Sequence, residues 1–205
     1  MSTEMKMCEV PFVGDTMPKL RAAAVQTSPV FLNREATVEK MAVKVKEAKE
    51  NGADIVVFPE SFVPTFPLWC LFIPPVDQHP FYKRLFENAV AVPSPAFYRI
   101  ARIARENKIF LSVGICEKSN DTFGTMWNSN LLFDREGNLI GHHRKLLPTW
   151  GEKLVWSFGD GSTLNVHDTE IGRIGALICG ENSNTLARYS LVAQGEQLHI
   201  GIYPP

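Results

Sequence analysis

The chain lacks any run of 18 or more apolar residues, the length that a membrane-spanning helix needs. It also has almost no net charge, because 21 Lys and Arg residues are balanced by 22 Asp and Glu residues. That balance argues against nucleic-acid binding and against a polybasic contact with a membrane surface. The 205 residues are 45% hydrophobic and 21% charged, which is typical of a globular domain large enough to bury a core.

The beginning of the chain lacks the charged start and apolar stretch of a secretory signal. We therefore expect residues 1–18 to form a flexible extension and the protein to be cytoplasmic. The four cysteines show no paired spacing; they are Cys8, Cys70, Cys116 and Cys179. This pattern favours a reducing compartment over a disulfide framework.

Motifs that would indicate a bound nucleotide or metal are incomplete. Gly159-Asp-Gly-Ser162 is rich in glycine, but it has no P-loop lysine, and we interpret it as a turn. His142 and His143 are adjacent, so on a strand they would point to opposite sides and would not share a metal ion. We expect neither a cofactor nor a metal.

Cys179 is the first candidate for chemistry. It lies in Ala176-Leu-Ile-Cys-Gly-Glu-Asn182, after an apolar strand and before a helix-like stretch. A helix N-terminus and a nearby cation can lower the pKa of a thiol below its usual value of about 8.5, which would favour the nucleophilic thiolate. A buried structural cysteine is the alternative, and Cys179 considered alone favours it.

Two further segments place a charged residue where an expected strand ends. Glu60 follows the apolar run of Asp54-Ile-Val-Val-Phe-Pro-Glu-Ser61, at the carboxyl end of a strand, where open α/β folds build their sites. Lys145 lies in Gly141-His-His-Arg-Lys-Leu-Leu-Pro-Thr149, which also closes on a proline. Taken singly, Glu60 could be a solvated loop carboxylate and Lys145 a surface lysine.

Three ordered motifs together resemble the nitrilase branch of the carbon–nitrogen hydrolase superfamily. They are Phe58-Pro-Glu-Ser61, His143-Arg-Lys-Leu-Leu-Pro-Thr-Trp-Gly-Glu152 and Leu177-Ile-Cys-Gly-Glu-Asn182, and the resemblance runs from about Lys19 to the last residue. It implies a sandwich of two β-sheets covered outside by helices, an αββα arrangement.

The resemblance also assigns roles to individual residues. It implies that Glu60 is the general base, Lys145 its cationic partner and Cys179 the nucleophile, with Glu152 as a supporting glutamate. The sequence departs from the family pattern at Gly180, where many relatives carry Trp. That departure leaves the shape of the substrate pocket open.

The activity that the resemblance implies is hydrolysis of a nitrile to a carboxylic acid and ammonia, through a thioimidate and a thioester. No metal, flavin or nucleotide is required. An amidase or a nitrile-hydrating relative with the same triad is the alternative among enzymes. A non-catalytic, truncated homologue that acts as an assembly partner is the alternative from another class.

Strands alternate with helices and are then followed by a block of strands, which indicates an α/β or mixed-sheet fold. Asn33 and Gly52 are expected to bound the first helix. The other expected helices cover residues 81–90, 96–107 and 186–193. The expected strands cover residues 20–26, 55–58, 109–116, 128–133, 139–146, 163–166, 174–179 and 198–202.

A long loop over residues 61–80 is rich in proline and aromatic residues. Its length suggests a functional role as a wall of the substrate pocket, and simple filling of the core is the alternative.

Members of the family continue beyond the strand that follows the nucleophile helix, whereas this sequence stops at Pro205. We therefore expect residues 19–205 to be a hydrolase domain that lacks its C-terminal part and leaves a sheet edge unpaired. The expected partners are a small-molecule nitrile and either further copies of the chain, as a homo-oligomer, or a complementing C-terminal segment.

Overall fold

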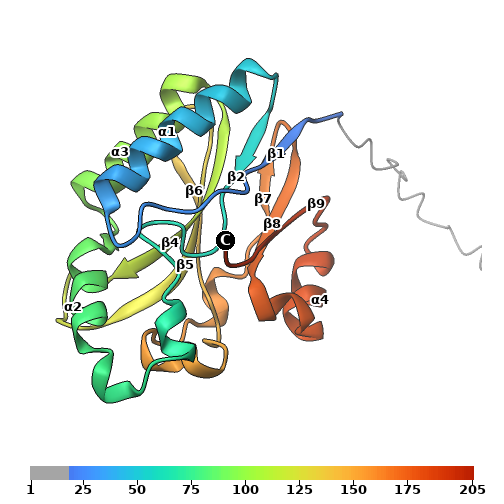
Figure 1. Cartoon of the computed structure of the whole chain (residues 1–205). Coiled ribbons are helices and arrows are strands. Elements are labelled where there is room, and N and C mark those ends of the chain that lie inside the picture. Colours follow the sequence, from blue (N-terminus) through green and yellow to red (C-terminus); the bar gives the residue numbers. More distant parts are fainter. Residues whose placement is uncertain (1–18) are drawn as a thin grey trace, which may run out of the picture.

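A computed structural model describes residues 19–205 of the chain. The flexible extension expected over residues 1–18, with Cys8, lies outside the described residues. Two β-sheets face each other, and helices cover their outer faces (Figure 1). The expected αββα arrangement is therefore confirmed. No helix in residues 19–205 is long and apolar enough to cross a bilayer.

The first sheet carries most of the strands. Its order is β1-β2-β4-β5-β6, and β3 also pairs with β4. The pairs β1–β2, β2–β4 and β3–β4 are parallel, whereas β4–β5 and β5–β6 are antiparallel. The bounds are Ala22–Ala24 for β1, Ile55–Val57 for β2, Val90–Ala91 for β3, Phe110–Lys118 for β4, Met126–Phe133 for β5 and Leu139–Arg144 for β6.

Helices α1 (Arg34–Glu50) and α3 (Pro95–Asn107) cover the outer face of this sheet, and α2 (His79–Asn88) lies below them in Figure 1. Asn33 caps α1 as expected, because its side chain accepts a hydrogen bond from the N–H of Ala36. Gly52, two residues beyond the helix, has a φ of +79°, which a residue with a side chain rarely adopts.

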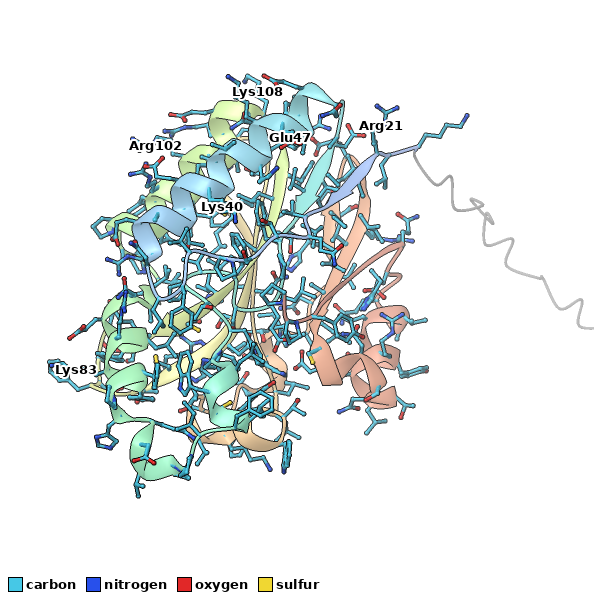
Figure 2. The ribbon with its side chains drawn as sticks, in the orientation of Figure 1. Arg21, Lys40, Glu47, Lys83, Arg102 and Lys108 are labelled. Atoms are coloured by element: carbon cyan, nitrogen blue, oxygen red, sulfur yellow. The ribbon has the colours of Figure 1, made fainter. Side chains whose placement is uncertain are left out.

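The two sides of these helices differ in character. Apolar side chains such as Met41 and Ile100 pack onto the sheet, whereas Glu47, Arg102 and Lys108 lie on the outer side (Figure 2). This amphipathic pattern explains why the helices form an outer layer.

The second sheet is smaller and has the order β7-β8-β9. Its strands are His167–Thr169 (β7), Gly172–Ile178 (β8) and Leu198–Ile202 (β9). Helix α4 (Thr185–Ala193) covers its outer face through Ala187 and Leu191, which pack against Leu177.

A core of apolar residues joins the two sheets. Ile55 and Phe110 of the first sheet pack in one cluster with Ile174, Ile178 and Ile200 of the second. The neighbour of Ile55 on β2, Val56, belongs instead to the cluster under α1 and α3. Both faces of β2 are therefore buried, which explains its continuous apolar sequence.

The structure corrects two of the expected elements. Residues 163–166 do not form a strand, because the N–H of Val166 and the carbonyl of Leu164 bond to the side chain of Gln194. The strand is β7, which begins at His167. The strand expected over residues 174–179 is β8, which ends at Ile178, because Cys179 begins a short 3₁₀ helix, η5 (Cys179–Ser183). The helix expected over residues 186–193 is confirmed as α4.

The loop over residues 61–80 contains two 3₁₀ helices, η1 (Leu68–Leu71) and η2 (Pro75–Asp77). Phe66 and Trp69 are buried in a core cluster with Trp156, whereas Phe72 is 80% exposed. Packing in the core therefore accounts for Phe66 and Trp69.

Candidate active site

Glu60 lies where β2 ends, between the two sheets. β2 ends at Val57, and the N–H of Phe58 still donates to the carbonyl of Ser112, but Pro59 has no N–H with which to continue this pairing. The backbone N–H of Glu60 donates to the carbonyl of Tyr203, just beyond β9, across 2.9 Å. The side chain of Glu60 is fully buried. The first sheet thus supplies this carboxylate, and the second sheet helps to hold its backbone.

Lys145 follows the last residue of β6 and is also buried, with a side chain only 1% exposed. Its backbone N–H continues the pairing with β5 by donating to the carbonyl of Asn128. Its ammonium nitrogen, Nζ, lies 2.9 Å from Glu60 Oε1 and 2.7 Å from Glu152 Oε2. One ammonium group therefore joins two buried carboxylates.

Glu152 is held by the turn that follows β6. It belongs to the 3₁₀ helix η3 (Trp150–Leu154), and its side chain accepts a hydrogen bond from the N–H of Thr149 at 2.8 Å. This is a capping box, in which a glutamate satisfies a free backbone donor at a helix start. The same oxygen, Oε2, also accepts a hydrogen bond from Lys145 Nζ, so the cap orients the carboxylate towards the lysine.

Cys179 lies at the junction of β8 and η5 and is half-buried. Its φ is +51°, an uncommon backbone conformation for a residue with a side chain. The amide of Asn182 donates to its carbonyl across 2.9 Å and holds this turn. The sulfur and one carboxylate oxygen each of Glu60 and Glu152 lie within 4.8 Å of one another. The structure thus brings together all four side chains that the resemblance singled out.

Two further polar residues belong to this site, although the sequence did not single them out. Asn128 on β5 donates from Nδ2 to Glu60 Oε1 at 2.6 Å, and Ser61 Oγ donates to Asn128 Oδ1 at 3.1 Å. Glu60 Oε1 therefore accepts from both Asn128 and Lys145. The other oxygen, Oε2, is buried and has no hydrogen-bond partner within residues 19–205. It is the oxygen left free to accept a proton.

Burial and charge shift the pKa values of the site. Burial raises the pKa of Glu60 above its usual range, and Lys145 offsets this effect only in part. Burial alone would lower the pKa of Lys145, but the two carboxylates raise it above its usual range. Lys145 therefore remains an ammonium at neutral pH.

The expected lowering of the thiol pKa is wrong. Burial, and then the negative charge of Glu60, raises the pKa of Cys179 to about 11, and Lys145 offsets only part of this rise. The thiol is therefore protonated at neutral pH and needs a base to become a nucleophile. The carboxylate of Glu60 is placed to serve as that base.

The same atoms have a spacing at which a metal ion could be held, since Glu60, Glu152 and Cys179 each offer one ligand atom. However, Lys145 Nζ already donates to both carboxylates. The positive charge of this site is thus supplied by the chain itself.

The two adjacent histidines point to opposite sides of β6, as expected. His142 contacts the buried Glu117, while His143 contacts Glu181. Gly180, beside the nucleophile, is exposed, and an added Cβ there would come within 3.1 Å of Thr149 Oγ1. A larger residue at this position would crowd the turn that carries Glu152.

Comparison with known proteins agrees with this geometry. The family described as Carbon-nitrogen hydrolase matches residues 21–204. Nitrilase 3 from an unknown prokaryotic organism is 43% identical over 190 residues, which are 92% of this chain and 57% of that protein. A cyanide hydratase from Gibberella baccata is 40% identical over 187 residues, which are 91% of this chain and 52% of that protein.

A solved structure of the amidase from Nesterenkonia sp. AN1 has a TM-score of 0.70 and 17% identity, and the match covers 89% of this chain and 66% of that one. At this identity the likeness shows the fold alone. The chain spans about half the length of the curated relatives it matches. The extent of the family match and the identity to these relatives show that the chain belongs to the carbon–nitrogen hydrolase family.

Proposed function

We propose that this chain carries the catalytic groups of a nitrilase, which hydrolyses a nitrile to a carboxylic acid and ammonia. The observation that carries the proposal is the buried Lys145, which bonds to Glu60 and Glu152 beside the thiol of Cys179. A buried charged cluster that touches a protonated thiol suits nucleophilic catalysis better than a structural role.

In the first half of the proposed reaction, Glu60 takes the proton of the Cys179 thiol and the sulfur attacks the nitrile carbon. One C≡N π bond breaks as the C–S bond forms, and the nitrogen gains a proton to give a thioimidate. Lys145 stabilises the charge that develops on the nitrogen, as donors in an oxyanion hole do. A positioned base of this kind contributes about 10²–10⁴-fold to the rate.

In the second half, water adds to the thioimidate carbon. The tetrahedral product expels ammonia and leaves a thioester on Cys179. A second water, deprotonated by Glu60, then breaks the C–S bond and releases the acid, and the thiol recovers its proton. Glu152 holds Lys145 in place through both steps, because its carboxylate is fixed by the cap at Thr149.

A nitrile-hydrating activity or an amidase activity is the second candidate. The relatives above include a cyanide hydratase, and the amidase from Nesterenkonia sp. AN1 shares the fold and is described with acrylamide added to its active-site cysteine. If the tetrahedral intermediate expels the thiol instead of ammonia, the product is the amide. The two outcomes use the same residues and differ only in the group that leaves.

Product analysis tests the proposal. The purified chain is incubated with aliphatic, aromatic and arylacetonitriles and with the matching amides, and the acid, amide and ammonia are measured. Equal amounts of acid and ammonia from a nitrile would support the nitrilase. Amide as the main product would favour the hydrating relative, and turnover of amides alone would favour the amidase. No turnover of any substrate would favour the non-catalytic assembly partner.

We also propose that the chain associates with further copies of itself or with a complementing C-terminal segment, in the cytoplasm. Strand β9 pairs only with β8 within residues 19–205, and Leu186, Tyr189 and Val192 of α4 are more than half exposed. An open strand edge and an apolar helix face both favour association. Analytical ultracentrifugation tests this part, and a monomer at all concentrations would contradict the homo-oligomer.

A further inference from the structure

Glu181 is a buried carboxylate that the proposed chemistry does not use. It lies two residues after Cys179, within η5, and is 5% exposed. A buried carboxylate is costly unless hydrogen bonds satisfy it, so its partners indicate what it does.

Two of the partners are backbone N–H groups next to site residues. The N–H of Ile178, which precedes Cys179, donates to Glu181 Oε2 at 2.8 Å. The N–H of Leu146, which follows Lys145, donates to Glu181 Oε1 at 2.6 Å. One carboxylate therefore joins the strand end that carries the lysine to the turn that carries the nucleophile.

The third partner is a side chain of β6. His143 Nε2 lies 3.0 Å from Glu181 Oε2, and its Nδ1 lies 2.8 Å from Thr163 Oγ1. An ionised carboxylate only accepts hydrogen bonds, so Nε2 must carry a proton and donate. Glu181 thus accepts three hydrogen bonds, two from the first sheet and its edge and one from the second.

The hydrogen bonds of Glu181 connect the two sheets that supply the catalytic groups. Glu60, Lys145 and Glu152 come from the first sheet and its loops, whereas Cys179 comes from the second. An error of about 1 Å in placing reacting groups can cost about 10²-fold in rate. A contact that sets the distance between the two sheets at this point would therefore control the reaction.

We propose that Glu181 is a positioning residue that sets the distance between the Cys179 thiol and the Glu60–Lys145 pair by binding the backbone on both sides. The proposal rests on the proposed function for its effect on turnover, but its effect on the thiol does not require turnover.

The test replaces Glu181 by glutamine, which keeps the size of the side chain. An amide has only one acceptor oxygen, and its NH₂ group would face a backbone N–H, so one of the two connections is lost. We expect kcat of Glu181→Gln to fall by about 10²-fold, with KM changed far less.

The second measurement is the alkylation of Cys179 by iodoacetamide between pH 6 and 10.5, followed by peptide mass spectrometry. In the wild type the pKa of the thiol is about 11, so the rate rises up to the highest pH. In Glu181→Gln we expect the turn to move away from Glu60 and to admit solvent to the thiol, so that both causes of the raised pKa weaken. The profile should then shift to lower pH, towards the pKa of a free thiol, about 8.5.

Glu117→Gln is the matched control. Glu117 of β4 is also buried, and its carboxylate accepts from Ser129 of β5 and from His142 and Arg144 of β6. His142 and Arg144 alternate along β6 with His143, the partner of Glu181, so Glu117 lies on the opposite face of the first sheet from Glu181. We expect this variant to keep the wild-type alkylation profile, although it loses stability. If both variants shift the profile alike, the effect is general loosening and the proposal is overturned.

A wild-type profile together with wild-type kcat in Glu181→Gln would also overturn the proposal. If Glu181→Gln does not fold, the test uses His143→Leu, which removes one donor to Glu181 and leaves both of its backbone hydrogen bonds in place. A smaller shift of the alkylation profile in the same direction would support the proposal, and an unchanged profile would contradict it. If the wild-type chain is inactive but its alkylation profile still depends on Glu181, the result contradicts the proposed function and supports the positioning role of Glu181.

Discussion

Asn128 donates its amide Nδ2–H to Glu60 Oε1 across 2.6 Å, from a strand 68 residues later in the chain. Lys145 donates to the same oxygen, so both bonds fix one side of the carboxylate and leave Oε2 free. The pair therefore determines which oxygen of Glu60 is available to the thiol of Cys179.

Asn128→Ala should lower kcat by about 10-fold to 10²-fold, because a hydrogen bond to a charged group contributes roughly 1.5–3 kcal/mol. The bond from Asn128 lowers the pKa of Glu60, so its loss raises that pKa further. The acidic limb of the kcat/KM profile should therefore move to higher pH. Ser61→Ala, which only weakens the orientation of Asn128, should give a smaller shift in the same direction, and a shift to lower pH in either variant would contradict the assignment.

Glu152→Gln should move the acidic limb of the kcat/KM profile to lower pH. The negative charge of Glu152 raises the pKa of Glu60, so its removal lowers that pKa and lets Glu60 act as a base at lower pH. The maximum rate should fall nevertheless, because Lys145 loses one of its two charged partners. A pH–rate profile of this variant beside Asn128→Ala checks both signs in one experiment.

Cys179→Ala should abolish turnover and leave the fold intact, as judged by circular dichroism. Cys70→Ala is the control, because burial also raises the pKa of Cys70 to about 11, yet Cys70 lies in the core cluster around Phe66 and Trp69. We expect this control to retain activity. Turnover in Cys179→Ala, or its loss in Cys70→Ala, would sink the assignment of the nucleophile.

Glu117 should make the protein sensitive to acid. Burial would raise its pKa, but hydrogen bonds and charge from His142 and Arg144 hold that pKa at about 2, below the usual 4.5. The folded carboxyl thus stays ionised where the unfolded one is protonated. Its contribution to stability is complete above pH 4.5 and is lost as the pH falls towards 2.

The two pKa values, 4.5 and about 2, correspond to roughly 3 kcal/mol of unfolding free energy. Urea unfolding at pH 7, 4.5 and 2.5 measures the loss. Glu117→Gln should be less stable than the wild type at pH 7, and its stability should decline less steeply below pH 4.5. An equal decline in both proteins would show that other carboxyl groups are responsible.

Much of the fold could be predicted because helix caps, turn residues and apolar runs act within a few residues of the sequence. Asn33 and Gly52 bound α1 through a cap and a left-handed backbone position, and β9 covers the expected residues 198–202. The three motifs also lie at strand ends, as their flanking prolines and apolar runs indicated.

The expectations that were wrong depend on contacts between residues far apart in the sequence. The apolar positions Leu164 and Val166 alternate like a strand, but Gln194, about 30 residues later, takes their backbone hydrogen bonds. The pKa of Cys179 is raised although a helix-like segment follows, since burial and Glu60 outweigh Lys145. No feature near Cys179 in the sequence reveals that balance.

The buried polar residues were the hardest to predict. Asn128 and Ser61 meet across 67 residues, and Glu181 meets Leu146 across 35. Asn128 gave one weak signal, because it is one of three consecutive polar residues, Asn128 to Asn130, in β5, and all three are buried. The partner that satisfies such a residue depends on the pairing of strands, which a single sequence does not state.

The division of the site between two sheets has a consequence for the protein as it is made on the ribosome. Synthesis runs from the N-terminus, so the strands with Glu60, Lys145 and Glu152 are complete before Cys179 has been added. The thiol meets these groups only when β8 and β9 dock and the N–H of Glu60 reaches the carbonyl of Tyr203. A nascent chain therefore carries Cys179 without its general base, and the pair of thiol and base forms only when the fold closes.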